Sequence, residues 1–220
     1  EYRSLQWRAH MKLGFVSLPR EGQIKFARDA GFDGIEVALA EQGEITLNST
    51  ESVLKAIVES ARKAGVGLVG LASVLFFKYS ITSDNPADRE KALSVAKKML
   101  EVASWLGVDT ILVIPGSVDV AWDPKFPVVS YDVVYDRSLA ALKELAPVAE
   151  KFKVSMGIEN VANKFMLSPL EARDLIDKVG SKYVGAYFDI GNILPIGYPE
   201  QWIRILGKRI KKVHVKDFRV

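Results

Sequence analysis

VSMGIENVANKFMLSPLEARDLIDKVGSKYVGAYFD (154–189) holds the pattern that decides the fold. Apolar runs lie at its two ends, at 154–160 and 183–189, and each has the length of a buried strand. Between them, SPLE (168–171) predicts a helix start, because the serine and glutamate side chains can accept from N–H groups that lack a helical partner. Gly180 predicts the helix end, since glycine adopts the left-handed conformation at a helix C-terminus at the least cost. The stretch therefore predicts a strand, a helix and a second strand.

The same unit recurs along the whole chain. Apolar runs occur at 12–17, 34–39, 66–73, 110–115, 154–160, 183–189 and 211–218, and they alternate with helical stretches at 21–30, 51–64, 86–106, 131–151, 169–179 and 199–206. Strict alternation of this kind predicts an α/β fold, in which helical crossovers join the strands of a parallel sheet.

Two architectures fit this alternation, an open doubly wound sheet and an eight-stranded barrel. A doubly wound nucleotide-binding fold needs a glycine-rich phosphate turn after an early strand, and SLPREG (17–22) is not one. This favours a (β/α)8 TIM barrel. Because only seven strands can be counted, we expect the chain to lack the last β/α unit. Residues 11–220 then form a single, C-terminally incomplete barrel domain, and residues 1–10 form a leader outside the fold.

The composition excludes several classes of protein. The chain has 220 residues, no cysteine and a formal net charge of +3. Disulfides and cysteine-ligated metal sites are therefore excluded, and the charge is too small to indicate nucleic-acid binding by itself. No apolar run approaches the roughly 18 residues of a membrane helix, and no signal peptide is visible. We expect a cytoplasmic protein with no nucleic-acid or membrane partner.

Three successive strands end in side chains that can bind a metal ion: Glu159, Asp189 and His214, spaced 30 and 25 residues apart. Strand alternation places all three on the inward side, with the apolar residues between them, such as Val213 and Val215, packing on the helices. The three would meet at the C-terminal mouth of the barrel, where a divalent cation would offset the cost of burying two carboxylates. Such a donor set suits Mn²⁺, Mg²⁺, Co²⁺ or Zn²⁺. The alternative interpretation is that each residue is a separate strand-end polar group satisfied by local contacts.

The segments GIEN (157–160), YFDIGN (187–192), VHVKDF (213–218) and FARDAGFDGIEVAL (26–39) resemble the xylose-isomerase-like TIM-barrel superfamily of sugar phosphate isomerases and epimerases, which includes ketose 3-epimerases and hexulose-6-phosphate isomerases. The resemblance covers the chain from about Met11 to its end. It implies one divalent metal ion held by Glu159, Asp189, His214 and a second glutamate on strand eight. No residue of this chain matches that second glutamate.

The resemblance also implies a reaction. A ketose or ketose phosphate would lose the proton next to its carbonyl, giving a metal-stabilised cis-enediolate, and Glu159 would act both as a ligand and as an acid/base. Return of the proton on the opposite face gives epimerisation, and return to the neighbouring carbon gives isomerisation. Two alternatives stay open: an inosose-type dehydratase on the same scaffold, or a non-catalytic relative. The DNA-repair endonuclease branch of the superfamily is disfavoured, because it needs many histidines and this chain has two.

Further residues are candidates for binding a sugar or sugar phosphate. Glu36 has inward parity on the second strand, where it could contact the substrate, support a metal ligand or be a structural carboxylate of the barrel. Asn160 follows Glu159 and could orient it. Asn192 lies three residues past Asp189, Lys216 faces inward beyond His214, and Arg219 follows in the loop. The lysine and the arginine suit a phosphate or a hydroxyl group. We also expect a homo-oligomer, a dimer or a tetramer.

Overall fold

The computed structural model describes residues 12–17, 19–120 and 123–216. Its strands pair in parallel and in chain order, forming one seven-stranded sheet. They are β1 (Gly14–Val16), β2 (Gly34–Ala38), β3 (Gly67–Ala72), β4 (Thr110–Val113), β5 (Ser155–Glu159), β6 (Val184–Asp189) and β7 (Ile210–His214). The predicted α/β alternation and parallel sheet are confirmed.

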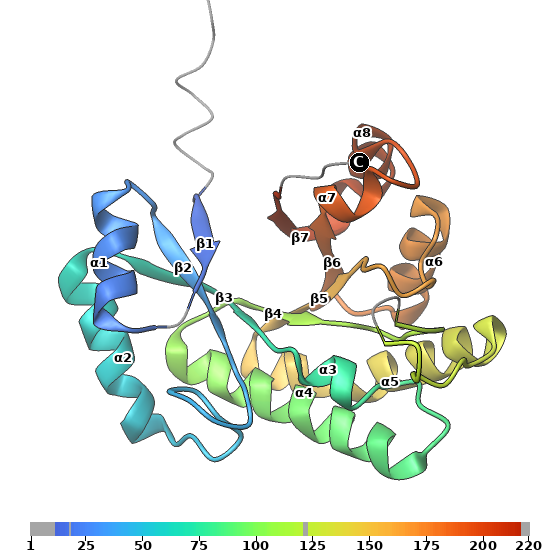
Figure 1. The fold of residues 1–220 in the computed structure, drawn as a ribbon, viewed down its shortest axis with the longest axis horizontal. Coiled ribbons are helices and arrows are strands. Elements are labelled where there is room, and N and C mark those ends of the chain that lie inside the picture. Colours follow the sequence, from blue (N-terminus) through green and yellow to red (C-terminus); the bar gives the residue numbers. More distant parts are fainter. Residues whose placement is uncertain (1–11, 18, 121–122, 217–220) are drawn as a thin grey trace, which may run out of the picture.

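The helices cover the outer side of a curled sheet (Figure 1). The longer ones are α1 (Glu21–Asp29), α2 (Glu51–Ala64), α4 (Pro86–Leu106), α5 (Tyr131–Phe152), α6 (Pro169–Val179) and α8 (Pro199–Leu206). Single turns form α3 (Leu75–Lys78), α7 (Ile190–Ile193) and the 3₁₀ helix η2 (Gly207–Arg209). Consecutive long helices pack against one another around the sheet. The arrangement is that of a TIM barrel seen over seven strands, as predicted.

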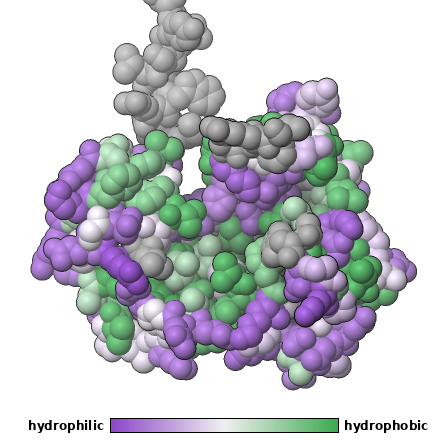
Figure 2. All heavy atoms as spheres, viewed as in Figure 1, coloured by the Kyte–Doolittle hydropathy of each residue, from purple (hydrophilic) through white to green (hydrophobic). Residues whose placement is uncertain are grey.

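The core lies between the sheet and the helices. Outward-facing strand residues such as Ile35, Val37, Ile111 and Met156 are fully buried, because they meet the apolar sides of the helices. Figure 2 shows hydrophobic residues toward the middle of one face of the molecule and hydrophilic residues along its edge. Among the described residues, no helix has the length and hydropathy needed to cross a membrane.

One part of the predicted packing is wrong. Val213 and Val215 were expected to pack on the helices, but they are 45% and 79% exposed. The physical reason is that, among the described residues, β7 pairs with β6 alone, so it lies at the edge of the sheet, where less of the molecule surrounds its side chains. The predicted leader, residues 1–10, lies outside the described residues, and the domain boundary at residue 11 stays a prediction.

The helix-start signals act as predicted, with one difference. At the start of α6, the Ser168 hydroxyl accepts from the Glu171 backbone N–H at 3.2 Å. In a capping box the Glu171 carboxylate would accept from the N–H of Ser168. It accepts instead from the N–H of Leu167, one residue earlier, at 3.0 Å. The helix ends at Gly180, whose φ of 77° is left-handed. These local features mark where α6 begins and ends.

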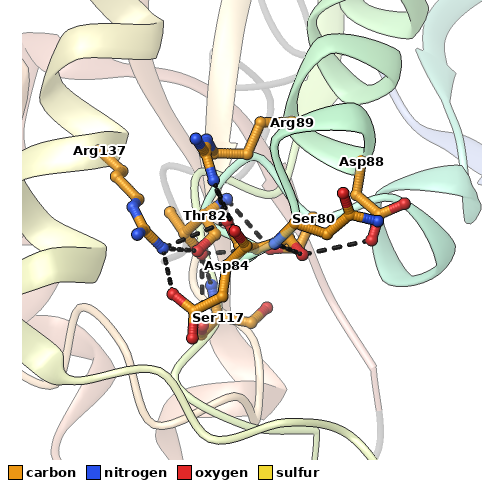
Figure 3. A network of polar contacts seen from close by, with 9 residues as sticks. Ser80, Thr82, Asp84, Asp88, Arg89, Ser117 and Arg137 are labelled. Atoms are coloured by element: carbon orange, nitrogen blue, oxygen red, sulfur yellow. Dashed lines mark hydrogen bonds and ion pairs between the residues drawn. The ribbon is translucent and has the colours of Figure 1, made fainter.

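A buried polar network fastens the loops that follow β3 and β4 (Figure 3). The hydroxyl of fully buried Thr82 accepts from the Ser117 backbone N–H at 3.0 Å, so the two loops are joined directly. From α5, Arg137 donates to the Thr82 carbonyl at 2.9 Å and to the Asp84 carboxylate at 2.7 Å. Both loops follow the C-terminal ends of their strands, so the network steadies the rim above the barrel interior.

Candidate metal centre

Glu159, Asp189 and His214 meet at the C-terminal ends of β5, β6 and β7. In the parallel register, Asp189 lies beside His214, and Glu159 lies beside Tyr187. A ligand atom from each of the three residues lies within 4.8 Å of those of the other two. His214 Nδ1 is 3.3 Å from Glu159 Oε1. The predicted convergence of the three side chains is therefore present in the structure.

The electrostatics of the cluster favour a cation. Glu159 is 8% exposed and Asp189 is 2% exposed, so two carboxylates share a buried site. Burial raises the pKa of Glu159, although the contact with His214 opposes that shift. Burial lowers the pKa of His214, but the contacts with Glu159 and Glu36 outweigh it and raise the pKa to about 10. The imidazolium thus provides positive charge between carboxylates.

Two carboxylates and one imidazole fit a divalent metal ion. The donor atoms are close enough to share one ion, and the charge of the ion would neutralise the two buried carboxylates. Among the described residues, the cluster has these three members only. Which ion it takes stays a prediction.

Asn160 holds Asp189. Its side-chain NH₂ donates to the Asp189 carbonyl, and its side-chain oxygen accepts from the Asp189 N–H, both at 3.0 Å. The amide thus reaches across to the backbone of the neighbouring strand, and its predicted role in orienting Glu159 stays a prediction. Asn160 is 6% exposed. Its predicted contact with a substrate stays a prediction.

Asn192 and Lys216 complete the surroundings of Asp189. The Asn192 N–H donates to Asp189 Oδ1 at 2.9 Å, and Lys216 Nζ lies 3.1 Å from Asp189 Oδ2. Lys216 also donates to Asn192 Oδ1 at 2.6 Å, and its side chain is half exposed. A side chain at Gly191 would collide with the Lys216 stem, which comes within 2.5 Å of the position of a Cβ atom. Arg219 lies outside the described residues.

Glu36 reaches the cluster from β2, on the other side of the imidazole. It is 4% exposed, it accepts a hydrogen bond from the Tyr187 hydroxyl, and His214 Nε2 lies 3.3 Å from its carboxylate. Burial and the Glu36 charge raise the pKa of Tyr187 above its ordinary value, so the phenol stays protonated and donates. Sequence reasoning gave Tyr187 no role. Its inward parity between Gly185 and Asp189 was the available signal.

A family comparison identifies the scaffold. The model of the xylose isomerase-like TIM barrel family matches residues 24–220. The chain belongs to this family. The resemblance inferred from the strand-end motifs is thereby confirmed.

Curated relatives of this family member include sugar phosphate epimerases. A 2-epi-5-epi-valiolone 7-phosphate 2-epimerase from Actinoplanes sp. is 26% identical and covers 88% of this chain. A putative L-ribulose-5-phosphate 3-epimerase from Escherichia coli strain K12 is 23% identical and covers 89%. The chain spans 66% and 67% of the lengths of these two relatives.

Solved structures show the same fold. The crystal structure of a D-psicose 3-epimerase in the presence of D-fructose is 20% identical, with a TM-score of 0.80 over 94% of this chain and 73% of that one. An L-ribulose 3-epimerase is 19% identical, with a TM-score of 0.73 over 94% of this chain and 70% of that one. At this identity, the likeness establishes the barrel architecture.

Proposed function

We propose that the protein is a divalent-metal-dependent isomerase or epimerase that acts on a ketose or ketose phosphate. The observation that carries the proposal is the meeting of Glu159, Asp189 and His214 within 4.8 Å at the ends of three neighbouring strands. Active sites of TIM-barrel enzymes lie at this end of the strands. The epimerases among its relatives and structural neighbours support the reaction class.

In this proposal, Glu159, Asp189 and His214 hold the cation, which when bound supplies a Lewis acid for the carbonyl of the substrate. Glu159 removes the proton from the carbon next to that carbonyl, leaving an enediolate. Return of a proton to the opposite face of the same carbon gives an epimer, and return to the neighbouring carbon gives an isomer. The resemblance implies a second glutamate, on an eighth strand, as the partner acid/base. The described part of the chain holds seven strands.

Lys216 and Asn192 are the proposed contacts for the substrate oxygens. Lys216 is half exposed, and its ammonium group already lies beside Asp189 and Asn192 at the edge of the cluster. A half-exposed ammonium can meet a hydroxyl or a phosphate that enters from solvent while it stays beside Asp189. Arg219 and Glu36 also stay proposed contacts for the substrate.

Deuterium exchange tests the reaction. The full chain is incubated in D₂O with Mn²⁺, Mg²⁺, Co²⁺ or Zn²⁺ and a panel of ketoses and ketose phosphates, and NMR locates the label. We expect label at the carbon next to the carbonyl for at least one substrate. Glu159→Gln should slow this exchange by about 10²- to 10⁴-fold, the usual contribution of a general base. Glu90→Gln, on the exposed side of α4, is the matched control. Unchanged exchange in Glu159→Gln would remove the glutamate from the mechanism.

The same experiment, with an inosose included in the panel, separates the alternatives. A relative from Pectobacterium atrosepticum, 21% identical over 75% of this chain and 61% of its own length, is a 3-oxo-isoapionate decarboxylase, so lyase chemistry occurs among the relatives. An inosose-type dehydratase would release water and give an unsaturated or keto product instead of an epimer. A non-catalytic relative would bind the metal but label none of the sugars.

A further inference from the structure

His214 offers its two ring nitrogens to two different carboxylates. Nδ1 lies 3.3 Å from Glu159 Oε1, on the side of the cluster, and Nε2 lies 3.3 Å from Glu36. We propose that Glu36, held in place by Tyr187, is a positioning residue that fixes the orientation and the tautomer of His214. This inference rests on the proposed metal site.

The chemistry of imidazole requires such a partner. A neutral ring that binds a metal ion through one nitrogen carries its proton on the other, and the acceptor of that proton decides which nitrogen is free. Glu36 lies at Nε2, so with a metal ion bound the Nε2–H would donate to Glu36, and Nδ1, which faces Glu159, would be free to bind the ion. Glu36 is not a member of the Glu159, Asp189 and His214 cluster.

Burial of Glu36 makes this contact necessary. Its side chain is 6% exposed, and Tyr187 donates to Oε2. Oε1 is buried and has no hydrogen-bond partner among the described residues, yet His214 Nε2 lies 3.3 Å from it. A buried carboxylate oxygen without a donor is costly, so a small rotation of the ring toward Oε1 supplies the missing hydrogen bond.

Two glycines make room for the pair. A Cβ atom at Gly70, on β3, would lie 2.6 Å from Glu36 Oε2 and 2.8 Å from the Tyr187 hydroxyl. A Cβ atom at Gly157, on β5, would lie 2.7 Å from the Tyr187 ring. A Cβ at either position would force these side chains to shift, so the present arrangement of the pair uses the space that both glycines leave. The Tyr187 ring also packs against His214, with 4.7 Å between the centroids.

A purely structural role for Glu36 makes a different prediction. If the carboxylate only filled the barrel interior, its replacement would change stability and leave the metal affinity and the proton position of His214 unchanged. Both quantities can be measured without any substrate. The metal affinity and the proton position therefore distinguish a positioning role of Glu36 from a purely structural one.

The experiment compares the full chain with Glu36→Gln, Tyr187→Phe and the exposed control Glu90→Gln. Zn²⁺ alone is titrated by calorimetry, and ¹⁵N–¹H NMR of the zinc-loaded proteins follows the imidazole of His214. In the wild type, we expect a protonated Nε2 with a downfield proton signal. Glu36→Gln should weaken Zn²⁺ binding by about 10- to 100-fold and displace that signal. Tyr187→Phe keeps the ring, so it should give a smaller change in the same direction, and Glu90→Gln should give none.

Each outcome has a definite meaning. If Glu36→Gln binds Zn²⁺ as tightly as the wild type and keeps its Nε2–H signal, the positioning role is overturned and the metal site survives. If the wild type binds no Zn²⁺, Mn²⁺, Mg²⁺ or Co²⁺, the proposed function fails and the inference fails with it. If circular dichroism shows that Glu36→Gln does not fold, Tyr187→Phe decides, and wild-type affinity and signal in that variant overturn the role.

Discussion

Gly157 illustrates how one missing methyl group shapes the interior. Adding a Cβ there would place it 2.7 Å from the ring of Tyr187, on the neighbouring strand β6. We expect Gly157→Ala to lower the free energy of unfolding by about 1–3 kcal/mol, the usual cost of overpacking a core. Urea denaturation measures it.

Gly22→Ala is the matched control for that substitution. Gly22 lies in α1, and a Cβ there meets nothing within 4 Å. Alanine in an exposed helix is favoured over glycine by up to about 1 kcal/mol, so stability should hold or rise. Equal losses in the two variants would contradict the close approach at Gly157.

At the residue scale, the sequence predicts the three-residue cluster but not the contact between Glu36 and Tyr187 beside it. Period-two alternation was enough to place Glu159, Asp189 and His214 on one side. The contact between Glu36 and Tyr187 joins residues 151 positions apart, and each residue lies beside a register shift, in the β2–β3 and β6–β7 pairings. No local pattern encodes such a shift, so the partner of Glu36 was not predictable.

At the scale of the elements, the contribution of the Ser168 cap at the start of α6 can be tested directly. The Ser168 hydroxyl accepts from the Glu171 N–H, so Ser168→Ala should cost about 1 kcal/mol of stability. Ser130, at the same position before α5, makes no such bond, and Ser130→Ala should cost less. Thermal unfolding of both variants compares them, and a larger loss for Ser130→Ala would contradict the assignment.

The loop network of Figure 3 gives a second test at this scale. Thr82→Val keeps the shape of the side chain but leaves the Ser117 N–H without its acceptor. We expect a loss of about 1–3 kcal/mol, because an unpaired buried donor costs its full desolvation. Thr50→Val is the control, since the exposed Thr50 hydroxyl contacts only the Ser52 hydroxyl among the described residues. Urea unfolding distinguishes the two.

The long helices were predictable because their ends carry local signals. Pro86–Leu106 and Pro169–Val179 begin with capping side chains followed by proline, and the structure has the same bounds. The single turns α3 and α7 were not predicted, because four residues are too few for a periodic pattern. The last strand was expected at 211–218 and is Ile210–His214, since pairing with β6 defines its extent.

At the scale of the whole molecule, metal binding should stabilise the fold. A ligand that binds only the folded chain adds about 2.7 kcal/mol when present at 100 times its Kd. We therefore expect Zn²⁺ or Mn²⁺ to raise the melting temperature of the wild type, and a chelator to reverse the rise. His214→Ala should show a much smaller rise. An equal rise in that variant would place the ion elsewhere.

An ion pair across the sheet gives a pH dependence. Asp109, before β4, lies 2.9 Å from Lys212 on β7. Partial desolvation raises the pKa of Asp109, but the contact with Lys212 and the hydrogen bonds from Thr110 and the backbone together outweigh it, so the net pKa is below the ordinary 3.8. The pair therefore stabilises the fold above about pH 4, and this contribution is lost as the pH falls through the folded-state pKa.

The Asp109→Asn variant measures that contribution. Near pH 6 it should be less stable than the wild type by less than about 1 kcal/mol, because Asp109 is exposed. Near pH 3 the difference in urea unfolding should shrink. A difference that grows toward acid would reverse the sign of the assigned pKa shift.

The architecture could be predicted from the alternation of strand and helix signals along the chain and from the absence of a phosphate-binding turn. Alternation fixed the parallel connectivity, and the lack of a phosphate-binding turn at 17–22 separated a barrel from a doubly wound sheet. The exposure of Val213 and Val215 was not foreseen, because burial at an edge depends on what lies beside it.

The two outer strands of the sheet differ in how they would meet a second copy of the chain. Among the described residues, β1 and β7 each have one neighbour, so each leaves backbone N–H and C=O groups open to pairing. On β7, Lys211 and Lys212 repel another such strand, whereas β1 (Gly14–Val16) carries no charge and leaves Val16 58% exposed. Of these two strands, β1 therefore receives another strand with less charge repulsion, and Val16→Lys should weaken pairing there.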